Sequence, residues 1–375
     1  MKILILTCNT GEGHNASARA IKEVFESQGC ACDIVDSLSL ISERASLLIS
    51  NWHTKIYRHL PKMFEAGYSY TERHPALLAA KRRNKLTISP GVTNLYKLLV
   101  RGGYDAIICV HVFSATAVSK MRRKFKTTIP SYFVATDYTC SPSVAESGMD
   151  LYFIPHGGLL SEFHACGLPA PALAPVGIPI RQAFYEKVAK GPAKALLGLP
   201  PDKRNVLLMC GSMGCGPMEA LAGALADALP ADAVLSVVCG TNERLRLALE
   251  GCKRKNVFVV GFTDKIPLLM DSADVFLTKP GGISISEAAS KGLPMLLIDA
   301  VGGCESRNLR YFLDRGWAQT AEGTDGIVRR CLEMLGNPER LERHAGSLQA
   351  DFSGNPAMEI FGRVYSEGMR PMRAL

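Results

Sequence analysis

The sequence lacks the features that would mark several common classes of protein. No apolar run approaches the roughly 18 residues that are needed to cross a bilayer. No Gly-x-x-x-x-Gly-Lys-Ser/Thr segment is present, which disfavours a P-loop NTPase. No Asp-x-Asp pair is present either, so a divalent cation is not the obvious partner for a diphosphate. These absences favour a protein without a membrane span, whose phosphate chemistry, if any, depends on backbone groups.

The twelve cysteines form no Cys-x-x-Cys pair and show no regular spacing. Four of them fall in apolar runs typical of strands: Cys8, Cys109, Cys210 and Cys239. We therefore expect buried, reduced thiols in a cytoplasmic protein, with neither a disulfide framework nor a metal site.

The composition is sufficient for two domains. The 375 residues are 47% hydrophobic and 21% charged, and single cores stop growing at roughly 250–300 residues. Apolar strand-like runs alternate with helical patterns, which predicts an α/β protein with parallel sheets. Ten strands are predicted, five in each half: 2–7, 32–36, 105–110, 131–136, 151–155, 205–210, 234–239, 257–260, 274–278 and 294–299.

The Pro- and Gly-rich stretch 167–179 is predicted to link the two halves. The predicted domains are therefore 1–175 and 176–354. Apolar residues recur at helical spacing in the tail, which predicts a closing helix within 355–375 that packs back towards the amino-terminal domain. Residues 40–100 fit the alternation poorly and are predicted to hold inserted helices and loops.

Positive charge is concentrated in residues 51–126, which carry 15 Lys and Arg against three acidic residues, a net charge of +12. Two clusters account for much of it: Lys81-Arg82-Arg83 with Lys85, and Arg122-Arg123-Lys124 with Lys126. In 52–64, aromatic and apolar residues accompany Lys55, Arg58 and Lys62. This mixture is typical of a segment in the headgroup region of an anionic membrane, although a solvated basic face remains the alternative.

The first chemical motif is Thr10-Gly11-Glu12-Gly13-His14-Asn15-Ala16, directly after an apolar run. Glycines at a strand-to-helix turn let the backbone approach a ligand, and a helix N-terminus favours negative charge. Gly11, Gly13 and Asn15 are predicted to form an acceptor or phosphate loop, with the His14 imidazole at the mouth of the sheet. Two alternatives stay open: a dinucleotide fingerprint with Asp36 on the ribose, and a histidine that only caps the helix.

Two more glycine-rich turns follow predicted strands. Gly211-Ser212-Met213-Gly214 offers backbone N–H groups to a diphosphate, with a plain βα turn as the alternative. Pro280-Gly281-Gly282 precedes a helix whose first N–H groups and dipole can face an anion. Glu287 lies about one turn into that helix, where its carboxylate can accept both hydroxyls of a ribose.

These motifs carry a resemblance. Three segments resemble the nucleotide-sugar domain of GT-B glycosyltransferases: Gly211-Ser212-Met213-Gly214, Val260-Gly261-Phe262-Thr263-Asp264 and Pro280-Gly281-Gly282-Ile283-Ser284-Ile285-Ser286-Glu287-Ala288. Three more are similar to monogalactosyldiacylglycerol synthases and bacterial processive diacylglycerol glucosyltransferases of glycosyltransferase family 28: Thr10 to Ser17, Ala135-Thr136-Asp137-Tyr138 and Val176-Gly177-Ile178-Pro179-Ile180-Arg181. The resemblance covers nearly the whole chain.

The resemblance implies two Rossmann-like domains whose parallel sheets face each other across a cleft. The first would bind a lipid acceptor and the second a UDP-sugar. His14 would be the catalytic base or an acceptor-site residue. Asp137, at a strand end of the same domain, could orient or assist it, or be a plain cap residue. The residues implied to contact the donor are Gly211, Ser212, Met213, Gly214, Phe262, Thr263, Gly281, Gly282, Ile283, Ser284, Glu287, Glu305 and Asn308.

Two segments depart from the family pattern. Gly302-Gly303-Cys304-Glu305, followed by Asn308, stands where relatives usually have Pro-Gly-Gln-Glu before an Asn. Cys304 thus replaces an amide in the loop that contacts the donor sugar. Ser141-Pro142-Ser143-Val144 stands where the plant-type enzymes carry His-Pro-x-Trp. The sequence therefore leaves the donor sugar open, and the acceptor pocket is expected to differ from that of the plant-type enzymes.

Taken together, the sequence predicts a glycosyltransferase that moves a hexose from a UDP-sugar to a lipid, by family inference diacylglycerol, in a metal-independent inverting transfer. We expect it in the cytoplasm at the inner face of the cell membrane, with UDP-sugar, lipid and anionic membrane as partners, no cofactor and no nucleic acid. The alternatives are a UDP-N-acetylglucosamine-using transferase or epimerase of the same fold, a nicotinamide dehydrogenase, and a non-catalytic sensor of lipid or nucleotide-sugar.

Overall fold

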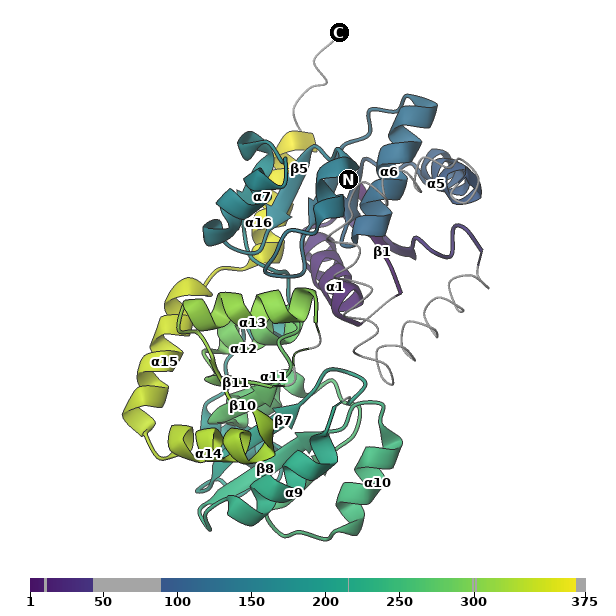
Figure 1. The fold of residues 1–375 in the computed structure, drawn as a ribbon. Coiled ribbons are helices and arrows are strands. Elements are labelled where there is room, and N and C mark those ends of the chain that lie inside the picture. The colour runs from purple at the N-terminus through teal and green to yellow at the C-terminus, as the bar shows by residue number, and fades with distance from the viewer. Residues whose placement is uncertain (10–11, 43–88, 215, 299, 301, 369–375) are drawn as a thin grey trace. The chain divides into compact units, whose positions relative to one another are not determined.

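The computed structural model describes residues 1–9, 12–42, 89–214, 216–298, 300 and 302–368, which form two compact units (Figure 1). Unit 1 consists of Met1–Gln182, Gly302–Cys304 and Gly354–Leu375, and unit 2 of Ala183–Val301 and Glu305–Ser353. Each unit is built on a six-stranded sheet whose strand pairs are all parallel. The predicted α/β class with two parallel sheets is confirmed.

The sheet of unit 1 has the order β2-β1-β3-β4-β5-β6. Its strands are β1 (Lys2–Thr7), β2 (Ala31–Asp36), β3 (Ala106–Cys109), β4 (Ser131–Val134), β5 (Leu151–Ile154) and β6 (Leu173–Pro175). The central strands are near-continuous apolar runs because helices cover both faces of a parallel sheet. The prediction for 167–179 was wrong in part, since β6 forms the edge of the sheet within the expected linker. Edge strands tolerate proline, so a Pro-rich stretch resembles a linker in sequence.

Helices pack on both faces of this sheet. Its helices are α1 (Glu12–Ser27), α5 (Ser89–Gly102), α6 (Val112–Phe125), α7 (Leu160–Ala165) and α16 (Pro356–Gly368), with 3-10 turns η1 (Pro142–Ser147), η2 (Gly157–Leu159) and η3 (Ala170–Ala172). The apolar stripe of α1 joins one core with the strands, and Ile360 and Val364 of α16 complete it. The yellow α16 packs against the purple α1 (Figure 1), where the Phe25 and Phe361 rings lie 5.2 Å apart.

The sheet of unit 2 has the order β12-β11-β10-β7-β8-β9. Its strands are β7 (Arg204–Met209), β8 (Ala233–Val238), β9 (Val257–Val260), β10 (Val275–Thr278), β11 (Met295–Leu297) and β12 (Gln319–Thr320). Its helices are α8 (Lys190–Leu196), α9 (Met218–Ala228), α10 (Glu243–Gly251), α11 (Ile266–Ser272), α12 (Gly282–Lys291), α13 (Cys304–Asp314), α14 (Gly323–Leu335) and α15 (Pro338–Asp351), and η4 (Gln182–Phe184) precedes them. The two-residue β12 was not predicted, because so short a strand leaves no periodic signal.

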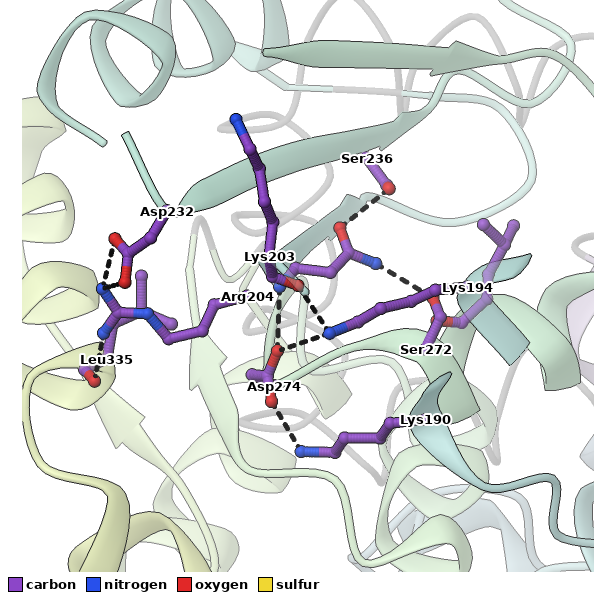
Figure 2. Close-up of polar contacts among 11 residues, drawn as sticks. Lys190, Lys194, Lys203, Arg204, Asp232, Ser236, Ser272, Asp274 and Leu335 are labelled. Atoms are coloured by element: carbon purple, nitrogen blue, oxygen red, sulfur yellow. Dashed lines mark hydrogen bonds and ion pairs between the residues drawn. The ribbon is translucent and has the colours of Figure 1, made fainter. Parts of the chain in front are cut away.

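A polar network fixes the amino-terminal edge of this second sheet (Figure 2). The fully buried Asn205 donates to Ser272 Oγ (2.9 Å) and accepts from Ser236 Oγ (2.8 Å), so its amide is satisfied within the core. Asp274 accepts from the Asn205 backbone N–H (2.8 Å) and pairs with Lys190 (2.6 Å). Buried polar groups are stable when each is paired in this way. This edge is therefore closed by the protein's own side chains.

The described cysteines are all free thiols, and the four that were placed in strand-like runs are buried. Burial raises the pKa of the Cys239 thiol to about 11 and raises the pKa of Cys109 as well, so both stay protonated at neutral pH. Within the described ranges, no helix has both the length and the apolar character to cross a membrane. The basic cluster 81–85 and the aromatic segment 52–64 lie outside the described residues.

Candidate functional site

Each sheet contains one point at which the chain reverses the direction of strand addition. In unit 1, β2 lies on one side of β1 and β3 on the other; in unit 2, β8 lies on one side of β7 and β10 on the other. Open parallel sheets bind ligands outside the carboxyl ends of the strands at such a switch point, because the loops diverge there. We call these places the unit 1 edge (the loops after β1, β3 and β4) and the unit 2 edge (the loops after β7 and β10).

His14 lies at the unit 1 edge, in the first turn of α1. Its Nδ1 is 2.9 Å from the carbonyl oxygen of Val110, which follows β3, and 3.0 Å from the hydroxyl of Thr136, which follows β4. A carbonyl oxygen can only accept, so Nδ1 donates in this hydrogen bond and carries the proton of the neutral ring. The lone pair then resides on Nε2, the state that a general base requires.

A second histidine, which sequence reasoning missed, contacts the first. His111 is the N-cap of α6, and its ring meets that of His14 edge-on, with centroids 4.6 Å apart and planes at 82°. The next ring along, that of Phe113, lies 5.0 Å from His111 and is 49% exposed. In the sequence, His111 is marked only by its position directly after an apolar strand. His14 also follows an apolar strand, but a glycine-rich turn precedes it and drew attention to it.

The rest of the first motif has structural partners. Asn15 accepts from the Thr7 hydroxyl at 2.9 Å, which ties α1 to the end of β1. Asp36 accepts from the backbone N–H groups of Asn9 (3.2 Å) and Leu38 (3.1 Å). An aspartate that bridges two loops in this way is poorly suited to hold a ribose, which weakens the dinucleotide alternative. Gly13 is partly exposed in the first turn of α1, and Gly11 lies outside the described residues.

Asp137 follows Thr136 in the loop after β4 and is half-buried. It is Thr136 whose hydroxyl reaches His14. The loop is fixed further along by Glu162 of α7, whose Oε1 accepts from the Thr139 hydroxyl (2.7 Å) and the Cys140 backbone N–H (2.8 Å). The structure thus places Asp137 beside the contact of His14 in a held loop, and its role stays a prediction.

The unit 2 edge is formed mainly by backbone. Helix α12 begins at Gly282. Its N-cap residue is Gly281, which has no side chain and therefore makes no capping hydrogen bond to the first turn. A Cβ built on Gly281 would meet no atom within 4 Å. Helix N-termini leave their first N–H groups without intrahelical partners, and they carry a partial positive charge. Gly281, Gly282, Ile283 and Ser284 therefore form an N-terminus that suits an anion.

The loop after β7 is shaped by close backbone packing. A Cβ on Gly214 would collide with the carbonyl oxygen of Cys239, and one on Gly240 with that of Ser212. Thr241 donates its backbone N–H to Ser212 O at 2.9 Å. Gly214 is therefore required by the loop after β8, independently of any ligand. Gly211 has a φ of +70° and open space around its Cβ position, and Ser212 and Met213 are half-exposed, so their contact with a diphosphate stays a prediction.

Side chains around α12 hold it in place. Asn308 of α13 is fully buried and donates to the carbonyl oxygen of Pro280 at 2.9 Å, so it supports the turn that precedes the helix. At the other end, the buried Lys291 pairs with Asp271 at 2.7 Å. Gly292, with a φ of +67°, ends the helix. This anchoring keeps the first turn of α12 fixed at the edge.

The other predicted donor contacts lie on α12, on α13 and in the loop after β9. Glu287 is 8% exposed in the second turn of α12, and Glu305 is half-buried in the first turn of α13. Phe262 is 72% exposed after β9, and the Thr263 hydroxyl accepts from the Lys265 backbone N–H at 3.1 Å, just before α11. Among the described residues, no group of three or more His, Cys, Asp or Glu side chains is arranged to hold a metal ion.

Comparison with known families gives matches in both units. Residues 14–180 match the model of monogalactosyldiacylglycerol (MGDG) synthase, and residues 201–345 match that of glycosyl transferases group 1. The chain is 27% identical over 377 residues to a processive diacylglycerol beta-glucosyltransferase of Bacillus cereus, covering 98% of this chain and 94% of that protein. It is 26% identical to the same enzyme of Staphylococcus saprophyticus, covering 93% and 88%.

Solved structures share the fold at low sequence identity. MurG of Acinetobacter baumannii superposes with a TM-score of 0.64 at 12% identity, covering 97% of this chain and 99% of that one. A putative UDP-N-acetylglucosamine 2-epimerase of Listeria monocytogenes gives 0.65 at 13% identity, covering 99% and 98%. These likenesses establish the GT-B type of fold. The sequence matches extend over both units: nearly the whole chain is similar to processive diacylglycerol beta-glucosyltransferases, and unit 1 also resembles monogalactosyldiacylglycerol synthases. Together with the match of unit 2 to glycosyl transferases group 1, these similarities identify the chain as a UDP-sugar glycosyltransferase.

Proposed function

We propose that this protein transfers a hexose from a UDP-sugar to the hydroxyl of diacylglycerol at a membrane surface, by a metal-independent inverting displacement. The observation that carries the proposal is the similarity to processive diacylglycerol beta-glucosyltransferases over 98% of the chain. The geometry of His14 and of α12 agrees with it, because one supports proton removal and the other supports a leaving diphosphate.

On the acceptor side, His14 is the proposed base. With Nδ1 donating to the Val110 carbonyl, Nε2 can take the proton of the acceptor hydroxyl. The oxygen then attacks the anomeric carbon from the face opposite the diphosphate, and the bond from that carbon to the diphosphate oxygen breaks. The sugar configuration is inverted, and the proton remains on the His14 imidazole until it is lost to solvent.

On the donor side, the leaving UDP carries the charge that develops. The backbone N–H groups of Gly282, Ile283 and Ser284 and the dipole of α12 are proposed to stabilise it. Glu287 is proposed to accept the ribose hydroxyls, with Phe262 and Thr263 at the uracil, Glu305 at the sugar, and Asn308 supporting the Pro280 turn. The absence of an Asp-x-Asp pair supports a transfer without a bound cation.

The membrane surface is proposed to contact α5 and α6, which pack together in unit 1. Arg123, Lys124 and Lys126 are exposed at the end of α6, and Val100 of α5 is 66% exposed. Exposed basic and apolar side chains together favour anionic bilayers, each basic residue contributing about 1 kcal/mol near the surface. Binding to vesicles should rise with anionic lipid, fall with salt, and weaken when these three cations are replaced by Gln.

The test is product analysis. The protein is incubated with a panel of UDP-sugars, with and without diacylglycerol, and the lipids are resolved by mass spectrometry. A new hexosyl lipid that requires both substrates supports the proposal, and its sugar identifies the donor. Epimerised nucleotide-sugar without lipid product would favour the epimerase alternative, and binding without turnover would favour a sensor.

The metal-free part has its own test. Activity should persist when EDTA is added, because backbone dipoles are proposed to neutralise the diphosphate. Loss of activity in EDTA that is restored by Mg²⁺ or Mn²⁺ would reject this part of the mechanism while leaving the transfer itself intact.

A further inference from the structure

The peptide unit that joins Val110 to His111 contributes twice to the unit 1 edge. Its carbonyl, from Val110, fixes the tautomer of His14 through the 2.9 Å hydrogen bond to Nδ1. The residue on the other side of this peptide bond, His111, carries a second imidazole. Its ring centroid is 4.6 Å from that of His14. The two rings are therefore held in one arrangement by the same short segment after β3, at the switch point of the sheet.

The two imidazoles carry their protons on different nitrogens. His111 Nδ1 accepts from the backbone N–H of Phe113 at 3.1 Å, so in the neutral ring the proton is on Nε2. His14 has the reverse arrangement, because its Nδ1 donates to a carbonyl. In the neutral state, Nε2 of His14 thus carries the lone pair of its ring, and Nε2 of His111 carries the proton of its ring. Such a pair can take a proton from one oxygen of a substrate while donating a hydrogen bond to another oxygen.

An apolar group lies directly beside this pair. Phe113, in the first turn of α6, is 49% exposed, although large aromatic side chains are usually covered. Its ring centroid is 5.0 Å from that of His111. A ligand that fits here presents oxygens to the two imidazoles and a hydrocarbon chain to the phenyl ring. The glycerol backbone of an acylglycerol, with its hydroxyl, ester oxygens and acyl chains, has this chemistry.

We propose that His111 and Phe113 form an acceptor-binding element: His111 Nε2–H donates to an ester oxygen next to the reacting hydroxyl, and Phe113 contacts the adjacent acyl chain. This inference rests on the proposed function, since it assumes a lipid acceptor deprotonated by His14. It assigns acceptor recognition to the loop after β3.

The experiment separates the N–H of His111 from its ring and from its capping role. His111→Asn keeps a side-chain oxygen that can cap α6 but removes the ring. His111→Phe keeps a ring against His14 but removes the N–H. Both should raise the acceptor KM by about 3- to 10-fold, the size of one neutral hydrogen bond, and leave the affinity for UDP unchanged. Phe113→Ala should raise the KM for long-chain diacylglycerol more than that for a short-chain, water-soluble one.

His156 offers a matched control. It caps η2 in the same way, its Nδ1 accepting from the Gly158 N–H at 3.0 Å, but it follows β5, away from the switch point. His156→Asn and His156→Phe should leave the acceptor KM unchanged. A wild-type KM in His111→Phe would overturn the inference, as would equal effects at His156. If the wild-type protein makes no glycolipid from any UDP-sugar, the proposed function itself fails instead.

Discussion

The carboxyl edges of the two sheets lie at equivalent switch points, yet they present different groups. The unit 1 edge presents imidazoles whose tautomers are fixed by backbone partners, Val110 O for His14 and Phe113 N for His111. The unit 2 edge presents the N-terminus of α12, where Gly281 adds no capping side chain. Moving a proton requires a group that can lose and gain one, whereas holding a diphosphate requires dipoles that stay fixed. The difference in residue type therefore matches the proposed difference in task.

The largest expected effect is at the unit 1 edge. His14→Ala should lower kcat by roughly 10²–10⁴-fold, the usual loss on removing a general base. UDP affinity, measured by calorimetry, should remain near the wild-type value, because the proposed donor contacts belong to unit 2. Near-normal turnover in the folded variant would move the base elsewhere and make Asp137 the next residue to test.

Glu287→Ala gives the reverse pattern at the unit 2 edge. UDP affinity should fall by about 1.5–3 kcal/mol, since the ribose would lose hydrogen bonds to a charged acceptor. Glu287→Gln is the matched control, because it keeps one acceptor oxygen in the same buried position and should lose less. Unchanged UDP affinity in both folded variants would remove Glu287 from the donor site.

Gly281 tests whether the N-terminus of α12 is kept open for a ligand. Its φ of −72° and ψ of 131° suit any residue, and a Cβ there meets no atom within 4 Å. Gly281→Asp should stabilise the protein by about 0.5 kcal/mol, because a carboxylate caps the helix and favours its dipole. The same carboxylate should weaken UDP binding by about tenfold or more through repulsion.

The informative feature of this variant is that stability and affinity move in opposite directions. Thermal unfolding without ligand and calorimetry with UDP measure the two separately. Gly281→Ala is the control for the added Cβ alone and should change UDP affinity little. If Gly281→Asp binds UDP as tightly as the wild type, the anion does not lie at this helix N-terminus.

The smallest effect concerns a histidine away from both edges. Burial lowers the pKa of His344 on α15 below its ordinary value near 6.5. The unfolded chain then binds a proton that the folded protein does not, so the free energy of unfolding should decrease as the pH falls below about 6.5. In urea titrations at pH 7.5 and 5.5, His344→Gln should show a smaller drop in midpoint than the wild type. An equal drop would mean that other groups carry the acid sensitivity.

The apolar runs determined most of the fold without help from the structure. Strands such as β1 and β10 are buried on both faces, so their residues must be nearly all apolar, and a run of that kind is visible in the sequence. The carboxyl end of α12 is also marked in the sequence, because Gly292 takes the left-handed conformation that ends many helices. The edge strands β6 and β12 were missed, since they are short and one of them is rich in proline.

The sequence by itself also singled out His14 and the Pro280 turn as candidates for chemistry, because each breaks an apolar pattern at a strand end. Only the tertiary structure decided which groups stand beside them. His111 is 97 positions from His14 along the chain, and the tautomers of both rings depend on backbone atoms that hydrophobic periodicity does not encode. Likewise, Gly214 is fixed by the approach of the loop after β8, and Asn308 by the Pro280 carbonyl. Crossover connections bring strands that are distant in the sequence side by side in the sheet, and so bring their loops together. A local sequence pattern carries no information about those contacts.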